Sequence, residues 1–394
     1  MMGAARSATA IMRMPWKNLP DALKVSLFMG LVEFLRSGFF VGFFPLFGLE
    51  VLKIPLSYVG FLTTLHYGTE AGTRIFAVWL ANRFALGVGF VLSAVLAFAS
   101  FYFFLWSPPV LYPLWAVTWG LALAPLWPRI AAYLRQLARP GFEGRSVSYA
   151  WLIIGPLIAA GSFGVGFLSK HDLAWGKSAL LFGSVLMLAA GLALFNLRFS
   201  ERLQKPPPKA WRRYLPLLVP AFLQALAPHL LTTVLFPFLK QSELGVQDVA
   251  WPLALSGLLF LAAFRFASVY ADQKDPANVV TLAAVFAMVG FGVLGFLPTD
   301  VAVDVSIPAI GVALGLYLPG WNAVIVRALP EGERGEGWAT LSTASGAAFA
   351  LGPFVGALAW DLIGPQGPFR LGLFLLALLI PYYQLYFRRL LAHR

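Results

Sequence analysis

The chain contains no cysteine, and only four of its 394 residues are histidine. Disulfides, cysteine-ligated zinc and thiol chemistry are therefore excluded. The histidines lie too far apart in the sequence to form a His-rich motif, so we expect no metal site. Charged residues are scarce as well, at 12%, whereas soluble domains carry about 25%. No arrangement of residues typical of catalysis is present, and we expect the chain not to be an enzyme.

Hydrophobic residues make up 59% of the chain and form long runs such as "GVGFVLSAVLAFASFYFFLW". Because about 20 apolar residues span a bilayer as a helix, the sequence predicts an all-α integral membrane protein. The first run is too long for the core of a signal peptide and is expected to remain as the first helix. The breaks between runs predict twelve transmembrane helices, at 21–47, 56–81, 86–106, 110–136, 146–168, 177–198, 214–240, 248–271, 277–297, 305–328, 337–362 and 368–388.

A polar, basic and proline-rich stretch at 198–213 divides the chain into residues 1–197 and 214–394. Its composition is typical of a linker, so we expect two six-helix bundles on either side of it. Lysine and arginine gather in this linker, in the N-terminal tail and in alternate loops, with Arg129 counted in the loop after the fourth helix. This positive-inside pattern predicts a multi-pass protein of the cytoplasmic membrane with the linker and both termini in the cytoplasm.

The net charge of +12 does not indicate nucleic-acid binding. A protein that binds nucleic acid carries its basic residues on one folded face. Here they lie on alternate loops along the chain, so we expect no nucleic-acid partner.

Ionisable residues lie inside two of the predicted helices: Glu33 and Arg36 in the first, and His66, Glu70 and Arg74 in the second. The spacings of three and four residues place the members of each group on one helix face. Each charge costs about 2.5–3.5 kcal/mol at the centre of a membrane helix, so such residues are functional candidates. Carboxylates in apolar surroundings are more easily protonated, which suits proton transport. The alternative is a structural ion-pair cluster that joins the two helices.

The second half of the chain is poorer in intramembrane polar groups, and His229 is one of the few. The sequence therefore predicts a central cavity with one charged wall and one mostly apolar wall, which suits a molecule with a polar head and a hydrophobic tail. Trp127 and Trp151 are candidates to line this cavity, since the face of an indole stacks on sugar rings. Packing in the core is the alternative for both.

Two loops at matching places in the two halves resemble the signature loop of the major facilitator superfamily. "VWLANRFALG" has Asn82 and Arg83 at its Asp-Arg positions, and "SVYADQKD" has Asp272 at the same place. "FEGR", "LPEGERGEG" and "GAAFALGPFVGALAWDLIG" are similar to further motifs of that superfamily. The resemblance implies two six-helix bundles around a midplane cavity that opens to alternate sides of the membrane.

Within the superfamily, the chain resembles the flippases of the lipoteichoic acid glycolipid anchor. The shared motifs are E-F-x-R at Glu33, H-x-x-x-acid at His66, P-L-W around Trp127, Y-x-W-L around Trp151, and L-P-x-W-N with Trp321 and Asn322. This family has aspartate where the chain has Glu70. The resemblance adds Trp321 and Asn322 to the candidates for the cavity wall.

Three classes of function remain open. The first is a proton-coupled flippase or exporter of a glycolipid or similar amphiphilic lipid, and the second is a proton-coupled exporter of amphiphilic drugs. The third is a role without transport, as a membrane scaffold or a lipid-modifying enzyme. For a transporter we expect no cofactor, a proton gradient as the energy source, and an amphiphilic lipid or small molecule, protons and membrane lipids as partners. We expect the chain to act as a monomer.

Overall fold

The computed structural model describes residues 18–81, 83–138, 143–197, 211–273, 275–297, 299–328 and 334–387. These residues are almost entirely helical, and each of the twelve predicted segments coincides with helical structure. Ten stretches within the described residues are long and apolar enough to cross a membrane. The two predicted segments outside that set are 56–81, with its polar face, and 214–240, which contains a break. That the protein has twelve transmembrane helices stays a prediction.

The chain divides into two compact units. The first unit comprises Met1–Phe43 and Gly72–Gln204, and the second comprises Phe44–Ala71 and Lys205–Arg394. The second unit thus takes in residues 44–71 as well as the C-terminal half. The predicted division at 198–213 stays a prediction, and 198–210 lie outside the described residues.

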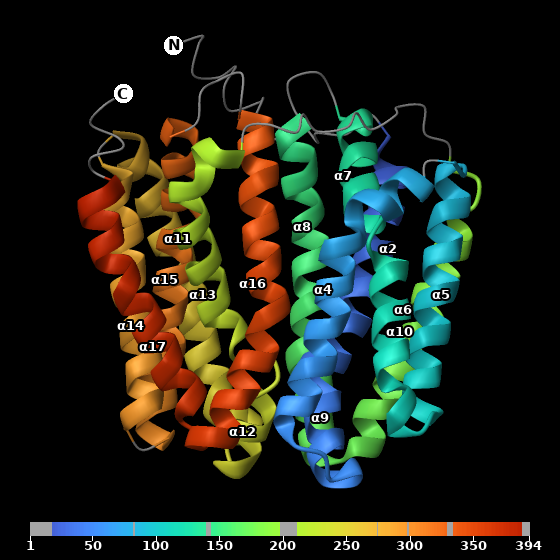
Figure 1. Cartoon of the computed structure of the whole chain (residues 1–394), viewed down its shortest axis with the longest axis horizontal. Coiled ribbons are helices and arrows are strands. Elements are labelled where there is room, and N and C mark those ends of the chain that lie inside the picture. The colour runs from blue at the N-terminus through green and yellow to red at the C-terminus, as the bar shows by residue number, and fades with distance from the viewer. Residues whose placement is uncertain are drawn as a thin grey trace. The chain divides into compact units, whose positions relative to one another are not determined.

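The first unit is built from one interrupted N-terminal helix and the helices packed around it (Figure 1). Its elements are α2 (Leu19–Ser37) with a π-helical continuation (Gly38–Phe43), α5 (Leu86–Trp106), α6 (Tyr112–Leu123), α7 (Leu126–Leu137), α8 (Glu143–Ala159) with its own π-helical continuation (Ala160–Val165), α9 (Gly166–His171) and α10 (Leu173–Ala193).

The second unit contains a bundle of long helices in which α13 packs on α15, α14 on α15 and α17, and α11 on α16 (Figure 1). Its elements are α3 (Phe44–Phe47), α11 (Trp211–His229), α12 (Leu235–Gln241), α13 (Val246–Gln273), α14 (Pro276–Phe296), α15 (Thr299–Ala328), α16 (Arg334–Ile363) and α17 (Gly367–Pro381), followed by a π-helical turn (Tyr382–Phe387). Helix α4 (Leu56–Ala81) has its first sixteen residues in this unit and the remainder in the first.

The predicted helix at 214–240 is not continuous. It breaks after His229, and residues 230–234 form turns before α12 begins. Pro228 lies in the last turn before the break and has no backbone N–H to donate to the carbonyl of Gln224, so this turn lacks one helical hydrogen bond. Thr233 in this break donates its hydroxyl to Pro353 O on α16, at 3.0 Å. A broken helix inside an apolar unit is tolerated where other helices satisfy the freed backbone groups.

Residues 44–71 are joined to the rest of the second unit by polar contacts and close packing. Lys240 Nζ lies 2.5 Å from Glu50 Oε1, and the Ser57 amide donates to Asp361 Oδ2 at 2.9 Å. Helix α4 also approaches α16 closely, because a Cβ on Gly60 would lie 2.5 Å from Pro353 O. Small residues at a helix contact let the backbones come together, as is common in membrane proteins.

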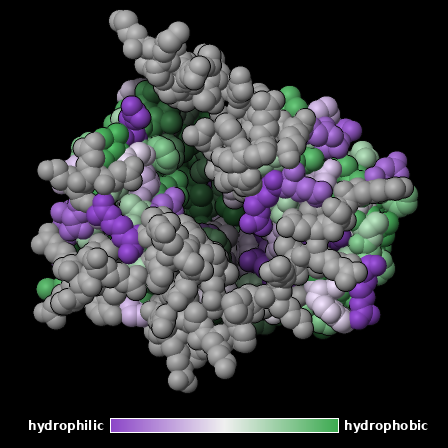
Figure 2. All heavy atoms as spheres, turned by 90° about the horizontal axis from the view of Figure 1, so that it is seen from above, coloured by the Kyte–Doolittle hydropathy of each residue, from purple (hydrophilic) through white to green (hydrophobic). Residues whose placement is uncertain are grey.

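The expectation that Arg129 lies in a loop is wrong. Arg129 lies in the first turn of α7 and its side chain is buried, at 3% exposure. Space for the guanidinium exists because Gly89 on α5 has no side chain, and a Cβ there would collide with Arg129 Nη1. Figure 2 shows hydrophilic side chains of other described residues exposed on the face that it views.

Candidate functional site

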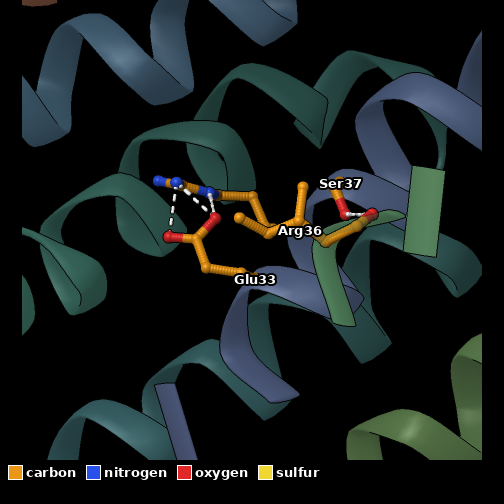
Figure 3. Close-up of polar contacts among 4 residues, drawn as sticks. Glu33, Arg36 and Ser37 are labelled. Carbon is orange, nitrogen blue, oxygen red and sulfur yellow. Dashed lines mark hydrogen bonds and ion pairs between the residues drawn. The ribbon is translucent and has the colours of Figure 1, made fainter. Parts of the chain in front are cut away.

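Glu33 and Arg36 form a buried ion pair on α2 (Figure 3). The helix begins after Asn18, whose side chain accepts from the Asp21 amide, and Pro20 lies in its first turn. The spacing of three residues then places the two charged side chains on one face. Arg36 Nη2 donates to Glu33 Oε1 at 2.6 Å and Arg36 Nε donates to Oε2 at 3.0 Å. The forked contact uses both carboxylate oxygens, which is the strong form of an Arg–carboxylate interaction.

The exposed fractions of these two side chains are 5% for Glu33 and 12% for Arg36. Burial strengthens their mutual attraction, but removing two charges from water costs several kcal/mol each. A pair of this kind is weak evidence for stability, so its place in an apolar helix favours a functional role.

The helix that carries the pair is held firmly against α8. Ser37 Oγ donates to Ile158 O at 3.2 Å (Figure 3). Directly after it, the π-helical continuation of α2 packs against that of α8, and a Cβ on Gly42 would lie 2.7 Å from Gly166 N. π-Helical turns are frequent at functional sites. Here they fix the direction in which the following helix continues and hold the Glu33–Arg36 face in place.

Helix α4 carries the second predicted group. His66 and Glu70 are buried, at 0% and 4% exposure, and Arg74 is partly buried one turn further on. They share one face of the helix because each is four residues from the next. His66 and Glu70 belong to the second unit and Arg74 to the first. The prediction that all five ionisable residues form one wall stays a prediction.

Trp127 on α7 and Trp151 on α8 stack on each other, with ring centroids 5.1 Å apart and planes inclined by 27°. Trp127 is partly buried and Trp151 is 46% exposed. Helices α7 and α8 both contact α2, so this pair lies in the same bundle as Glu33 and Arg36. The partial exposure of this stacked pair is compatible with contact between an indole and a flat, hydroxylated ring.

The three candidates from the second half differ in their surroundings. Trp321 is buried at 7% exposure and its ring is parallel to that of Tyr317, at 6.3 Å. Asn322 next to it is exposed. His229, at the end of α11, has its Nδ1 2.8 Å from Ala225 O, and its ring stacks on Phe349 at 4.0 Å.

A mostly apolar cavity of about 260 Å³ lies inside the second unit, between α11, α14, α15, α16 and α17. Alanine, leucine, valine, isoleucine and phenylalanine supply most of its wall. His229 and Tyr317 line it, and so do Gln224 and Tyr383, which are joined by a hydrogen bond of 2.8 Å from the Tyr383 hydroxyl to Gln224 Oε1. Sequence reasoning missed this cavity and the contact between Tyr383 and Gln224. Among the residues that line the cavity, only His229 was a candidate from the sequence.

The predicted loop motifs are only partly described. Asn82 lies outside the described residues. Arg83 places its guanidinium over the Trp79 ring, 4.1 Å from the ring centroid, at the end of α4. Asp272 lies in the last turn of α13, and its side chain is outside the described part. Within the described residues, no group of histidine and carboxylate side chains has the arrangement of a metal site.

No protein-family model matches the chain. Among curated proteins, the chain is similar to the proton-coupled antiporter flippase LtaA of Staphylococcus haemolyticus, at 23% identity over 362 residues that cover 87% of this chain and 88% of the relative. It is also similar to the protein of the same name from Staphylococcus aureus, at 22% identity with the same coverage.

Solved structures of transporters match almost the whole chain. A bacterial homologue of the human lysosomal transporter Spinster, in an inward-facing and unoccupied conformation, gives a TM-score of 0.72 at 13% identity and covers 95% of this chain and 97% of its own. The nucleoside transporter NupG (D323A mutant) gives 0.70 at 12% identity, covering 92% and 98%. A D-xylose–proton symporter gives 0.69 at 12% identity, covering 94% and 98%.

These names are those of transporters and not of enzymes, in agreement with the sequence prediction. Together with the ten apolar helices, they identify the chain as a multi-pass membrane protein. The chain therefore has the fold of the major facilitator superfamily, and the resemblance to its transporters, with the flippase LtaA among them, is confirmed.

Proposed function

We propose that this protein is a proton-coupled secondary transporter that moves a glycolipid, or a similar lipid with a hydroxylated headgroup, between the two leaflets of the cytoplasmic membrane. The observation that carries the proposal is the buried Glu33–Arg36 pair in an otherwise apolar helix. A headgroup with several hydroxyls can accept from the guanidinium and donate to the carboxylate, through charge-assisted hydrogen bonds.

The other features support the same cargo. The stacked indoles of Trp127 and Trp151 offer an aromatic face to a sugar ring. The apolar cavity in the second unit offers surface to an acyl chain. A chain gains almost nothing when it moves from lipid to an apolar protein wall. The headgroup therefore decides which lipids are moved, and the tails are tolerated.

Proton coupling is assigned to the buried carboxylates of Glu33 and Glu70. Both side chains are buried, and a carboxyl group can bind a proton and release it again. The names of the relatives, proton-coupled antiporter flippases, support exchange of protons for lipid. The proton gradient then supplies the energy, and we expect the protein to work as a monomer without a cofactor and with both termini in the cytoplasm.

The test is a flipping assay with purified protein in liposomes. The probe is a diacyl glucosyl lipid with a fluorescent label on its headgroup, and the readout is its accessibility to a quencher in the outer leaflet under an imposed pH gradient. Arg36→Lys keeps the charge but loses the planar fork, so flipping should slow about tenfold, in line with the ~1.5–3 kcal/mol carried by hydrogen bonds to charged groups. Arg265→Lys on α13, an exposed arginine, is the matched control and should flip normally.

Export of amphiphilic drugs is the competing outcome. A lipophilic cation should move poorly, because it lacks the hydroxyl groups that the Glu33–Arg36 pair is proposed to bind. Proton-driven export of such a cation by the same liposomes, without flipping of the glycolipid, would establish the drug exporter and overturn the proposal.

A further inference from the structure

Two hydrogen-bonded polar side chains, Gln224 and Tyr383, line the cavity inside the second unit. A cavity that bound only hydrocarbon chains would not require them. We infer that Gln224 donates a hydrogen bond to the carbonyl oxygen of an acyl ester in the cargo, and thereby distinguishes ester-linked from ether-linked lipids. The inference rests on the proposed function and adds to it a second site of recognition, below the headgroup.

The geometry fixes one end of the Gln224 amide and leaves the other uncommitted. Tyr383, at 1% exposure, donates its hydroxyl to Gln224 Oε1 at 2.8 Å. The amide nitrogen Nε2 of Gln224 is buried and has no hydrogen-bond partner among the described residues. A buried amide donor without a partner costs free energy that a plain apolar side chain would not. An acceptor supplied by a bound ligand would recover this cost.

Two neighbouring polar side chains are directed at backbone carbonyls and not at Gln224 Nε2. Ser345 donates its hydroxyl to Ala221 O at 3.2 Å, and His229 Nδ1 contacts Ala225 O at 2.8 Å. Most of the other residues around the cavity are apolar, with alanines on α14 and α15 among them. Because Nε2 is buried, the proposed contact requires the Gln224 amide to turn toward the cavity when the ligand enters.

The chemistry of the wall defines the acceptor. The described residues that line the cavity include no lysine or arginine, so an ionised carboxylate or phosphate would lack a counter-charge from them. A neutral carbonyl needs one donor only. The volume of about 260 Å³ lies below the ~300–1,000 Å³ of sites that enclose a drug-sized ligand, so the cavity is too small to enclose a whole diacyl lipid. An ester carbonyl at the head of a single acyl chain has both required properties, a neutral acceptor and an attached hydrocarbon.

The experiment measures binding, so that it does not depend on flipping. Purified protein in detergent is titrated with radiolabelled 1-acyl-3-glucosylglycerol and with its 1-O-alkyl ether, which has the same chain length and headgroup but lacks the carbonyl. Wild type should bind the ester about two- to tenfold more tightly, the range of one net hydrogen bond. In Gln224→Met, which keeps the length and removes the donor, both probes should bind with equal affinity.

The matched control is Gln384→Met, one residue beyond Tyr383. Gln384 Nε2 already donates to Thr281 Oγ1 at 2.7 Å, and Gln384 does not line the cavity, so this variant should keep the ester preference. Tyr383→Phe frees Gln224 Oε1 and loosens the amide, and it should reduce the preference without abolishing it. Equal binding of both probes by wild type, or an unchanged preference in Gln224→Met, overturns the inference even where the liposomes flip glycolipid. A preference that depends on Gln224 in a protein that flips no lipid would instead overturn the proposed function and leave this site standing.

Discussion

Arg36 holds both carboxylate oxygens of Glu33 on a single face of α2, with donor–acceptor distances of 2.6 Å and 3.0 Å and almost no exposure of the carboxylate. Each side chain therefore neutralises the other in an environment where an isolated charge would be strongly unfavourable. A proton or a headgroup that arrives at this pair has to replace part of that forked contact. Protonation of Glu33 therefore changes how the pair binds cargo, and bound cargo changes how readily Glu33 is protonated.

Removing one partner of this pair should destabilise the protein, whereas removing both should not. Arg36→Gln leaves the Glu33 carboxylate buried without its guanidinium, and we expect a loss of about 3–5 kcal/mol in the free energy of unfolding. The double variant Glu33→Gln/Arg36→Gln is neutral and should recover most of that loss, while flipping stays absent. Thermal unfolding in detergent and the liposome assay measure the two effects. A double variant as unstable as the sum of the single ones would show that the charges are not coupled.

Glu70→Gln should remove the dependence of flipping on the pH gradient while leaving the protein folded. The amide has the size of the carboxylate and stays neutral, so it cannot take up and release a proton. Flipping is measured at a series of imposed pH gradients. Glu50→Gln is the matched control, since Glu50 is 36% exposed and pairs with Lys240, and it should keep the dependence. Glu70→Gln with wild-type pH dependence would make Glu70 a structural residue.

Much of the fold could be predicted because long apolar runs leave few alternatives to membrane helices. The Glu33–Arg36 contact could be predicted for a similar reason, since residues three apart on a helix face each other whatever surrounds them. Contacts between distant segments have no such periodic signal. Gln224 and Tyr383 are 159 residues apart in the chain, and their pairing depends on how α11 packs against the end of α17.

Two other features could not be predicted because each depends on a single proline or glycine. The break after His229 depends on whether Pro228 kinks a helix or ends it, and a proline permits both. The burial of Arg129 depends on a glycine forty residues earlier, Gly89, which leaves a space of the right size. A basic residue near the end of an apolar run otherwise indicates a loop.

The contact between the two π-helical turns of the first unit should be sensitive to a single methyl group. In Gly42→Ala the new Cβ would meet the backbone of Gly166 at 2.7 Å, and overpacking of this kind costs about 1–3 kcal/mol. Gly155→Ala on α8 is the matched control, because a Cβ there meets no atom of the described residues within 4 Å. It should be neutral or slightly stabilising, since alanine favours a helix over glycine. Unfolding temperatures in detergent should therefore fall for Gly42→Ala alone.

The predicted orientation can be tested with single cysteines, since the chain has none of its own. Gln136 in the last turn of α7 and Gln241 at the end of α12 are both exposed. Gln136→Cys should react with a membrane-impermeant maleimide only from the cytoplasmic side, and Gln241→Cys only from the opposite side. Intact cells and inverted vesicles provide the two sides. Labelling of both positions from the same side would contradict the predicted topology.

The buried charge of Arg129 should lower the free energy of unfolding. Its Nη2 donates to Phe84 O at 3.3 Å, while its Nε has no hydrogen-bond partner and no carboxylate pairs with it among the described residues. An apolar side chain of similar length avoids the cost of burying that charge. Arg129→Met should therefore raise the free energy of unfolding by about 1 kcal/mol or more. Arg135→Met on the same helix, where the arginine is exposed, should change it by less than ~0.5 kcal/mol.

The same site allows a test of the packing that buries the guanidinium. Gly89→Ala should destabilise the wild-type protein, because the added methyl group collides with Arg129 Nη1. In the Arg129→Met background the same substitution should cost much less, since the flexible thioether chain can move aside. A double-mutant cycle of unfolding free energies measures this coupling. Two results together would contradict these predictions: Arg129→Met is less stable than wild type, and Gly89→Ala has the same effect in both backgrounds. They would mean that an anionic partner neutralises the guanidinium and that Arg129 stabilises the protein through this contact.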